Sequence, residues 1–396
     1  MSTGQLGVNV MAKVVICYTH ITPRLVRRIQ CLAERVPDLV ALEVAGCESV
    51  YPWWQGRHAV GTVRQVQLFQ RPLEDLSQRE IIEAARAFLE REEPDVAILT
   101  GYDSRYMRFM ARWVKKHGGR TILPMVTWAG DRRRWALKEW AKGWVVRRLF
   151  DAVGAGGQRT QAYCLGLGFS PQQIWRLFNV VDNEHFASGA ERARGTAPSL
   201  RSQLGLPTHY FLFIGALEVW KNVAHLLECY ARYRRGGGHW GLVLVGAGSQ
   251  MESLRGRALR EQIPDVVFAG MKKHEETPAY YGLASCLVLP SLSETWGLVV
   301  NEAEAAGLPV LASSQCGCVP ELVHRGINGY VFDPTDGPEL VRLLHLISDG
   351  RLNRERLGQS SRDLIQYYTP ERWADALADC VRHQQLTNRA NGPCAA

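Results

Sequence analysis

The stretch Leu289-Pro-Ser-Leu-Ser-Glu-Thr-Trp-Gly-Leu-Val-Val-Asn-Glu-Ala-Glu-Ala-Ala-Gly-Leu-Pro-Val-Leu, residues 289–311, decides how the chain is expected to fold. It begins with the end of an apolar strand, a loop follows that contains Glu294, and Gly297 lets the backbone turn closely. A helix then runs to about Ala306, where a glycine and a proline end it. The order strand, loop, helix is one unit of a parallel sheet covered by helices.

The same alternation runs through the whole chain, because short apolar runs are separated by longer amphipathic segments. The strands predicted from it are 14–17, 40–44, 96–99, 121–126 and 152–155, then 211–214, 242–245, 266–269, 286–289 and 309–311. Helices are predicted at 24–35, 78–90, 105–116 and 132–150, then at 222–234, 250–261, 276–284, 297–306, 337–348, 353–367 and 371–385. We therefore expect an α/β protein with two doubly wound, Rossmann-like domains that face each other across a cleft.

A polar stretch, residues 187–200, is the best candidate for a linker between the two domains. The predicted domains are 11–190 on the acceptor side and 203–370 on the side that binds a nucleotide sugar. A last helix, 371–390, is predicted to pack back on the first domain.

Residues 297–302 have the pattern of an anion site. The amides of Gly297, Leu298 and Val299 fall in the first helical turn, where they have no intrahelical partner. Glu302 lies about one and a half turns further on and suits paired ribose hydroxyls, which need a bidentate acceptor. On these residues alone, a surface helix with ordinary acidic side chains is the favoured interpretation.

The wider pattern resembles a known family. Pro-Ser-x-x-Glu-x-x-Gly-x-x-x-x-Glu-Ala, followed by Gly-x-Pro-Val, is similar to the motif of the family 4 retaining glycosyltransferases, also called glycosyl transferases group 1. Further segments resemble the same family, densely from about 150 to 337 and thinly before 130: 179–186, 213–222, 245–248, 268–271, 319–323 and 326–334. The resemblance implies the two-domain fold named GT-B.

The resemblance also implies roles for individual residues. Lys221 would neutralise the donor diphosphate, and Glu294 would contact the donor sugar and support the charge that builds up on its anomeric carbon. Glu302 would bind the ribose. The remaining donor-side residues are Gly215 in the first loop of the second domain, the amides of Gly297, Leu298 and Val299 at the distal phosphate, and Met271 with Lys272 at the base.

By this resemblance we expect an enzyme that moves a hexosyl group from a nucleotide-diphosphate sugar to a saccharide or lipid-linked acceptor, with retention. Such an activity would serve cell-surface polysaccharide, lipopolysaccharide or glycolipid synthesis. No Asp-x-Asp motif occurs in the sequence, so we expect neither a metal nor a cofactor. Two alternatives stay open: an enzyme related to nucleotide-sugar epimerases or phosphorylases, and a degenerate member that binds a nucleotide sugar without turnover.

The sequence departs from the family at three places. Ala216 stands where an Arg usually joins the Lys in a phosphate clamp. The first loop, residues 18–24, lacks the usual Gly-Gly pair, and the segment 127–131 lacks the usual His. His20 and Asp131 are therefore the candidates for acceptor-side polar groups, with a structural role equally open for each.

The charge of the chain is concentrated in one segment. The formal net charge is +8, yet residues 105–148 hold thirteen Lys or Arg against Asp131 and Glu139, a net charge of +11. Five tryptophans, at 113, 128, 135, 140 and 144, interleave with these charges. Three interpretations remain: a helix that packs its apolar face into the domain, arginines that bind an acceptor phosphate, and an anionic membrane surface. Nucleic acid is not expected, because no recognised binding module accompanies the charge.

The ten cysteines are scattered and form no C-x-x-C pair, so a reducing compartment is expected. Residues 1–10 lack the regions of a signal peptide and are interpreted as a loose extension or as a misassigned start. No stretch approaches the roughly 18–20 apolar residues of a spanning helix. These features favour a cytoplasmic protein, with a peripheral position on the inner face of the plasma membrane as one option.

Overall fold

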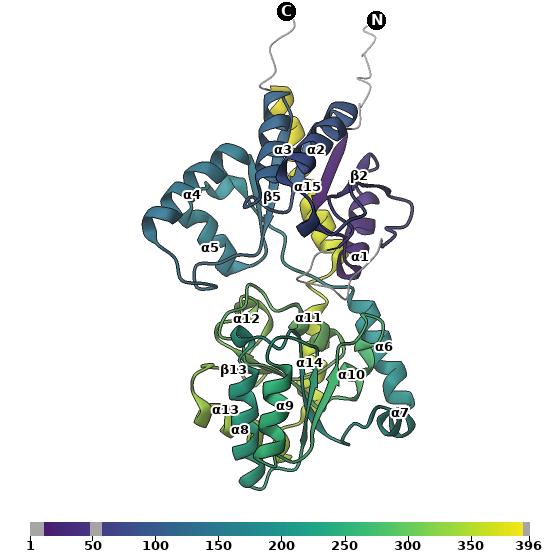
Figure 1. Cartoon of the computed structure of the whole chain (residues 1–396), viewed down its shortest axis with the longest axis vertical. Helices are drawn as coiled ribbons and strands as arrows, with labels where there is room; N and C mark the ends of the chain where they lie inside the picture. Colours follow the sequence, from purple (N-terminus) through teal and green to yellow (C-terminus); the bar gives the residue numbers. More distant parts are fainter. Residues whose placement is uncertain (1–11, 48–57, 391–396) are drawn as a thin grey trace, which may run out of the picture.

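The computed structural model describes residues 12–47 and 58–390, and the predicted loose extension lies outside them. Two parallel sheets form two domains, one above the other in Figure 1. The first sheet has the strand order β3-β2-β1-β4-β5-β6-β7, and the second has the order β10-β9-β8-β11-β12-β13. The predicted α/β class, with two Rossmann-like domains, is confirmed.

The first domain contains seven strands with helices on both faces. Its strands are β1 (Val14–Tyr18), β2 (Leu39–Glu43), β3 (Arg64–Gln67), β4 (Val96–Leu99), β5 (Arg120–Met125), β6 (Ala152–Ala155) and β7 (Ile174–Arg176). Its helices are α1 (Pro23–Ala33), η1 (Leu73–Asp75), α2 (Gln78–Glu92), α3 (Arg105–Lys116), α4 (Ala136–Leu149), α5 (Gln158–Gly166) and η2 (Pro171–Gln173). The central strands are apolar on both faces because helices bury both sides of the sheet.

The second domain repeats the arrangement with six strands. These are β8 (Tyr210–Ile214), β9 (Gly241–Val245), β10 (Val266–Gly270), β11 (Cys286–Leu289), β12 (Val310–Ser313) and β13 (Gly329–Phe332). The helices are α6 (Asn183–Gly195), α7 (Ala197–Leu204), η3 (Val219–Lys221), α8 (Val223–Arg235), α9 (Met251–Arg260), α10 (Thr277–Leu283), α11 (Leu298–Ala305), α12 (Val319–Leu322), α13 (Gly337–Ser348) and α14 (Arg354–Ile365).

The strand order of each sheet reverses at one point. In the second sheet that point lies between β8 and β11, which pair directly through Cys286 and Phe211. In the first sheet it lies between β1 and β4. Ligands of open α/β sheets bind at such switch points, beyond the carboxyl ends of the strands. The loops that follow β8 and β11 are those that contain Lys221 and Glu294.

The predicted linker is helical. Residues 187–200 fall in α6 and α7, and α6 packs against α10 and α11 of the second domain through Phe186 and Ala190, which are fully buried. The polar residues that suggested a linker lie on the outer side of these helices. The chain instead crosses between the domains just before α6, and it crosses back after α14. The two crossings lie side by side, because Asn183 Nδ2 donates to the carbonyl oxygens of Ile365 (3.0 Å) and Tyr368 (3.2 Å).

The last helix, α15 (Pro370–Ala390), returns to the first domain. It lies along α1 and against β4 to β7 (Figure 1). Trp373, Leu377 and Val381 are buried there in one cluster with the core strands β1 and β4. The last helix therefore completes the hydrophobic core of the domain in which the chain begins.

Three further features bear on the site. The nine cysteines in the described part of the chain are all free. Within 12–47 and 58–390, no three or more His, Cys, Asp or Glu side chains are arranged to hold a metal ion. Among the helices of these residues, none combines the length and the apolar character that crossing a bilayer requires.

Replacing Trp373 tests the contribution of α15. Trp373→Ala should lower the free energy of unfolding by about 3–5 kcal/mol, because it removes a large buried ring and leaves a cavity. Urea unfolding followed by circular dichroism measures this. Tyr367→Ala, at an exposed ring just before α15, is the control and should cost less than about 1 kcal/mol. Equal losses in both variants would contradict a core role for α15.

Candidate functional site

Lys221 and Glu294 meet at the switch point of the second sheet. Their side chains form an ion pair between Nζ and Oε2, although 73 residues separate them in the sequence. Lys221 ends η3, and the next residue, Asn222, has a left-handed backbone and donates to the carbonyl oxygens of Pro290 and Pro334. The structure therefore brings the two predicted catalytic side chains together in one place.

The first turn of α11 lies directly after this pair. Gly297 caps the helix with φ 101°, a left-handed conformation that favours glycine. The amides of Leu298 and Val299 fall in the first turn, where a helix has no backbone acceptors for them. Close by in the fold, a Cβ on Gly246 would lie 1.9 Å from the carbonyl oxygen of Gly215, so these two loops touch through bare backbone.

Glu302 is fully buried and already has partners. The guanidinium of Arg24, from the first turn of α1, lies 2.6 Å from its Oε1. The hydroxyl of Tyr281 donates to Oε2 at 2.6 Å. Burial and, after it, the Glu302 carboxylate raise the pKa of Tyr281 well above its usual value. A ribose that binds Glu302 would therefore compete with a side chain of the first domain.

The loop that contains Glu294 is also held by the first domain. The indole N–H of Trp128 donates to the Glu294 carbonyl oxygen at 3.0 Å. The hydroxyl of Ser293 donates to the carbonyl oxygen of Asp131. Arg159, on α5, stacks its guanidinium over the Trp128 ring. The same guanidinium donates to the carbonyl oxygens of Ser314 and Cys316, in the loop after β12, at 2.9 Å each. These contacts make the candidate site an interdomain site.

The base-side candidates lie after β10. Met271 is exposed, and Lys272 lies over the ring of Tyr280 at 5.7 Å. His274 follows and stacks on His185 of α6, with ring centroids 4.6 Å apart. Burial, and then the neighbouring His185, Arg24 and His58, lower the pKa of His274 to about 3, so its ring is neutral at neutral pH.

The two acceptor-side candidates are both engaged in the first domain. His20 is buried, and its Nδ1 lies 2.8 Å from a carboxylate oxygen of Glu43. Asp131 accepts from the backbone N–H of Trp128 and pairs with Arg134, so its carboxylate shapes the turn before α4. Asp131 nevertheless lies at the cleft, because its own carbonyl oxygen receives the Ser293 hydroxyl.

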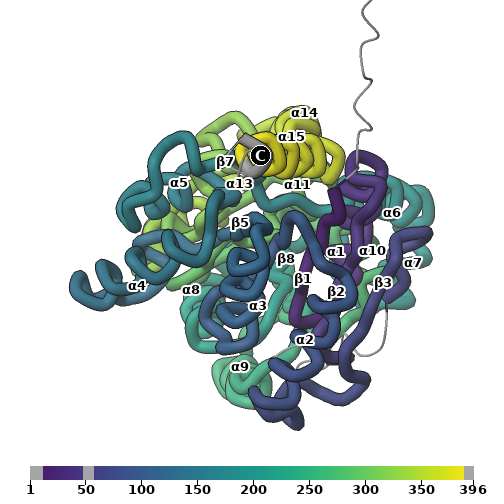
Figure 2. Tube along the Cα trace, turned by 90° about the horizontal axis from the view of Figure 1, so that it is seen from above, coloured from purple at the N-terminus to yellow at the C-terminus, as the bar shows by residue number. Residues whose placement is uncertain are grey.

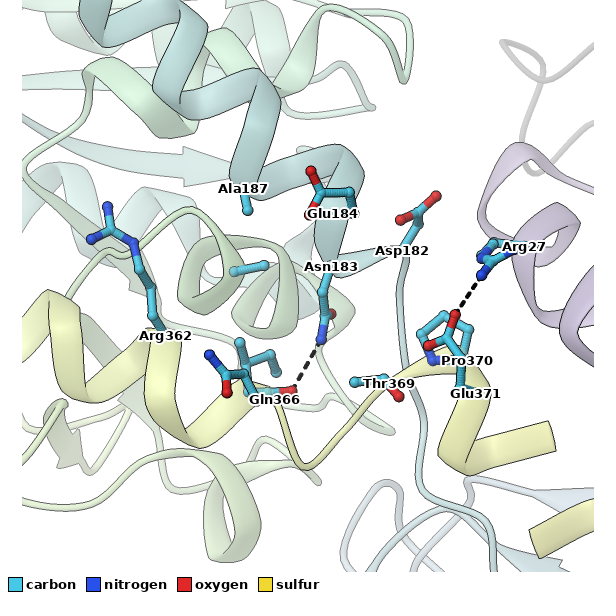
Figure 3. Close-up of a pocket in the computed structure, with 12 residues that line it drawn as sticks. Arg27, Asp182, Asn183, Glu184, Ala187, Arg362, Gln366, Thr369, Pro370 and Glu371 are labelled. Carbon is cyan, nitrogen blue, oxygen red and sulfur yellow. Dashed lines mark hydrogen bonds and ion pairs between the residues drawn. The ribbon is translucent and has the colours of Figure 1, made fainter. Parts of the chain in front are cut away.

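A cavity of about 360 Å³ lies away from this site, where the chain crosses between the domains (Figure 3). Arg27 and Arg362 lie on its opposite sides, and Arg27 pairs with Glu371 at 2.6 Å. Asn183 projects into it from the start of α6. None of the predicted site residues lines this cavity.

Sequence reasoning missed Arg24, Trp128 and Arg159. Arg24 and Trp128 lie in the part of the first domain where the family resemblance is thin, and Arg159 lies outside the segments whose motifs resemble the family. One signal was present, because Trp128 lies in the segment 127–131 that replaces the family's His. Only the fold shows that this segment reaches Glu294.

Comparisons with known proteins match part of the chain to a known family. Residues 199–364 match the family model described as Glycosyl transferases group 1. The chain is 25% identical over 275 residues to an alpha-D-kanosaminyltransferase of Streptomyces kanamyceticus, an alignment that covers 68% of this chain and 69% of the relative. It is 30% identical over 240 residues to a D-inositol 3-phosphate glycosyltransferase of Thermobifida fusca, covering 57% of this chain and about half of the relative (54%).

Solved structures share the fold. Anabaena Alr3699/HepE, crystallised in complex with UDP, superposes with a TM-score of 0.72 at 15% identity and covers 94% of this chain and 100% of its own. A sucrose-phosphate synthase from Thermosynechococcus elongatus gives a TM-score of 0.72 at 17% identity, with coverage of 95% and 100%. At these identities the likeness shows the two-domain architecture alone.

A double-mutant cycle tests the interdomain pair of Arg24 and Glu302. Arg24→Ala should lower the free energy of unfolding by about 1–3 kcal/mol, because it removes a partner of a buried carboxylate. Combining it with Glu302→Gln should recover part of that loss, since the amide needs no cation. Urea unfolding of the parent, both single variants and the double variant measures the coupling. Strictly additive losses would contradict an interaction across the domains.

Proposed function

Because the chain belongs, through residues 199–364, to the glycosyl transferases group 1 family, we propose that it transfers a sugar from a nucleotide-diphosphate donor to a saccharide or lipid-linked acceptor. The transfer retains the anomeric configuration and requires no metal and no cofactor. The reaction contributes to cell-surface polysaccharide, lipopolysaccharide or glycolipid synthesis. The protein works in the cytoplasm.

The observation that supports this proposal most directly is the ion pair of Lys221 and Glu294 beside the first turn of α11. Sugar transfer passes through an oxocarbenium-like state while a diphosphate leaves. Lys221 and the amides of Gly297, Leu298 and Val299 supply positive charge and donors for the leaving phosphates. Glu294 supplies a carboxylate for the sugar, on the same side as the leaving group.

In the substrate-free site, Lys221 and Glu294 are each other's counter-ions. A diphosphate that binds Lys221 takes over as its partner and leaves Glu294 for the donor sugar. Glu302 exchanges Arg24 for the ribose hydroxyls, so the guanidinium leaves its present contact with that carboxylate. Donor binding is therefore coupled to a contact between the domains.

A uridine diphosphate sugar is the first donor to test. The support is that HepE was solved with UDP and with UDP-glucose, and a trehalose-6-phosphate protein of E. coli with UDP-2-fluoro glucose. Met271 and Lys272, after β10, are proposed to line the base site.

Ala216 is the observation that keeps a rival function open. It stands where a second phosphate-binding cation is expected, and one charge-assisted hydrogen bond contributes about 1.5–3 kcal/mol. Arg159 is the proposed compensating cation, because it donates to the carbonyl oxygen of Cys316, which forms a β-bridge with Glu294. Nucleotide binding without turnover over a broad acceptor panel would favour the non-catalytic alternative. Conversion of the donor without acceptor would favour an epimerase.

Two substitutions should act in opposite directions on nucleotide binding. Lys221→Ala should weaken UDP binding by about tenfold or more, because a charged hydrogen bond to phosphate is lost. Glu294→Gln should strengthen UDP binding by about threefold, because it removes the carboxylate that competes for Lys221. Isothermal titration calorimetry with UDP measures both effects.

Both variants should nevertheless lose sugar transfer, by about 100- to 1,000-fold, because each removes a group that stabilises charge in the transition state. UDP release from UDP-glucose is measured over a panel of saccharide and lipid-linked acceptors. Lys116→Ala, at an exposed lysine that ends α3, is the matched control and should behave like the parent. Parental transfer rates in both site variants would show that the site is assigned wrongly.

Chelation tests metal independence separately. Transfer should proceed at the same rate in excess EDTA as in added magnesium, since lysine and helix amides neutralise the leaving diphosphate here. Complete loss of activity in EDTA, restored by magnesium or manganese, would overturn this part of the proposal while leaving the transfer reaction itself intact.

A further inference from the structure

Helix α4 presents large apolar side chains to solvent. Trp135 is 72% exposed, Leu137 77%, Trp140 70% and Trp144 47%. Leu137, Trp140 and Trp144 are spaced by three and four residues, so they share one face of the helix. A contiguous exposed group of this size marks an interaction site on a soluble domain.

The opposite face of α4 fixes this orientation. Gly143, Val146 and Leu149 are buried, and a Cβ on Gly143 would lie 2.5 Å from the carbonyl oxygen of Leu167. The helix therefore packs closely against the turn after α5. Of the three interpretations left open by the sequence, the one in which this helix packs its tryptophan-containing face into the domain is wrong, because glycine and aliphatic residues take that place.

A polar network holds the start of the helix. Glu139 pairs with Arg134 at 3.2 Å and with Lys142 at 2.9 Å, and it accepts the Tyr163 hydroxyl of α5. Asp131 pairs with Arg134. The only two acidic residues of 105–148 are thus paired with basic side chains of the same segment.

The exposed basic residues around α4 are not neutralised. Arg132, Arg133, Lys138 and Arg148 are exposed, and across 12–47 and 58–390 no carboxylate forms an ion pair with any of these four. The Arg148 guanidinium lies 4.1 Å from the centre of the Trp144 ring, so charge and aromatic surface adjoin. We call these four residues, together with Trp135, Leu137, Trp140 and Trp144, the α4 face.

We propose that the α4 face binds the surface of a bilayer rich in anionic phospholipid. Tryptophan and leucine enter the interfacial region, where amphipathic rings are favoured, and the arginines and lysine neutralise lipid phosphates. A protein partner would need an acidic group placed opposite each of these cations, whereas an anionic bilayer offers phosphates at every position beside its apolar interior.

The position of α4 in the fold relates this binding to the candidate site. Figures 1 and 2 both show α4 at the outer edge of the first domain. The loop that precedes it contains Trp128 and Asp131, which contact Glu294 and Ser293 across the cleft. Only three residues separate Asp131 from Trp135. A bilayer bound to the α4 face therefore lies next to the acceptor side of the cleft, where a lipid-linked acceptor would enter.

Vesicle binding tests the proposal without any substrate. The full-length chain is sedimented with vesicles of phosphatidylcholine alone and with vesicles containing one part phosphatidylglycerol to two parts phosphatidylcholine. The chain should bind the anionic vesicles at least tenfold more tightly, and raised salt should weaken this binding, since each basic residue at the surface contributes about 1 kcal/mol, or roughly fivefold. Failure to bind either vesicle, or equal binding to both, would overturn the proposal.

A matched pair of variants tests the surface itself. Leu137→Ser with Lys138→Gln should weaken binding to anionic vesicles at least fivefold, and adding Trp140→Ser should abolish it. Leu259→Ser with Arg260→Gln changes an equally exposed Leu–basic pair on α9, where Leu259 is 78% exposed, and should bind like the parent. Equal losses in both pairs would overturn the assignment to α4.

Analytical ultracentrifugation of the chain alone separates self-association from lipid binding. We do not expect the chain to form a dimer that the substitution Leu137→Ser dissociates. A concentration-dependent dimer that this substitution dissolves, in a chain that fails to bind vesicles, would show that the α4 face is an interface between copies. UDP binding by the same variants should stay at the parental level, so a negative result here leaves the proposed transfer reaction standing.

Discussion

The hydrogen bond from the Trp128 indole N–H to the Glu294 carbonyl oxygen joins the two domains at the centre of the candidate site. Glu294 is held through its backbone by the first domain and through its carboxylate by Lys221 of the second. Its position therefore depends on how the domains meet. Arg24 adds a second dependence of the same kind at Glu302. Each of the two glutamates that define the motif is thus positioned in part by a residue of the other domain, Glu294 by Trp128 and Glu302 by Arg24.

In this arrangement the charged side chains of the substrate-free site neutralise one another in pairs. Lys221 faces Glu294 and Arg24 faces Glu302, so no strong unpaired charge is left at these positions for small anions to occupy. A donor with both a diphosphate and hydroxyl-bearing rings can replace both pairings at once. A simple phosphate can replace only the contact with Lys221. Selectivity for the complete nucleotide sugar then arises from exchange of partners rather than from an empty, pre-charged pocket.

The sequence predicted the architecture well where local chemistry determines it. The central strands are continuous apolar runs, so periodicity and length identify them. The edge strands β3, β7 and β13 were missed because each has only three or four residues, and only pairing with a neighbour makes it a strand. In the site, the motif located Lys221 and Glu294, whereas Arg24 and Arg159 depend on tertiary contacts that no local pattern encodes. For α4 the amphipathic spacing was evident, but the direction of its apolar face follows from Gly143, which alone allows the approach to Leu167.

The return of α15 to the first domain affects how the chain is made. Domains usually fold in the order in which the ribosome releases them. Here the second domain, from α6 to α14, is complete before Trp373 and Leu377 leave the ribosome, and until they arrive α1 covers that face of the first sheet without its partner helix. The segment synthesised first is thus expected to mature last. A nascent first domain would spend most of translation with part of an apolar sheet face exposed, a state in which chaperones have time to act.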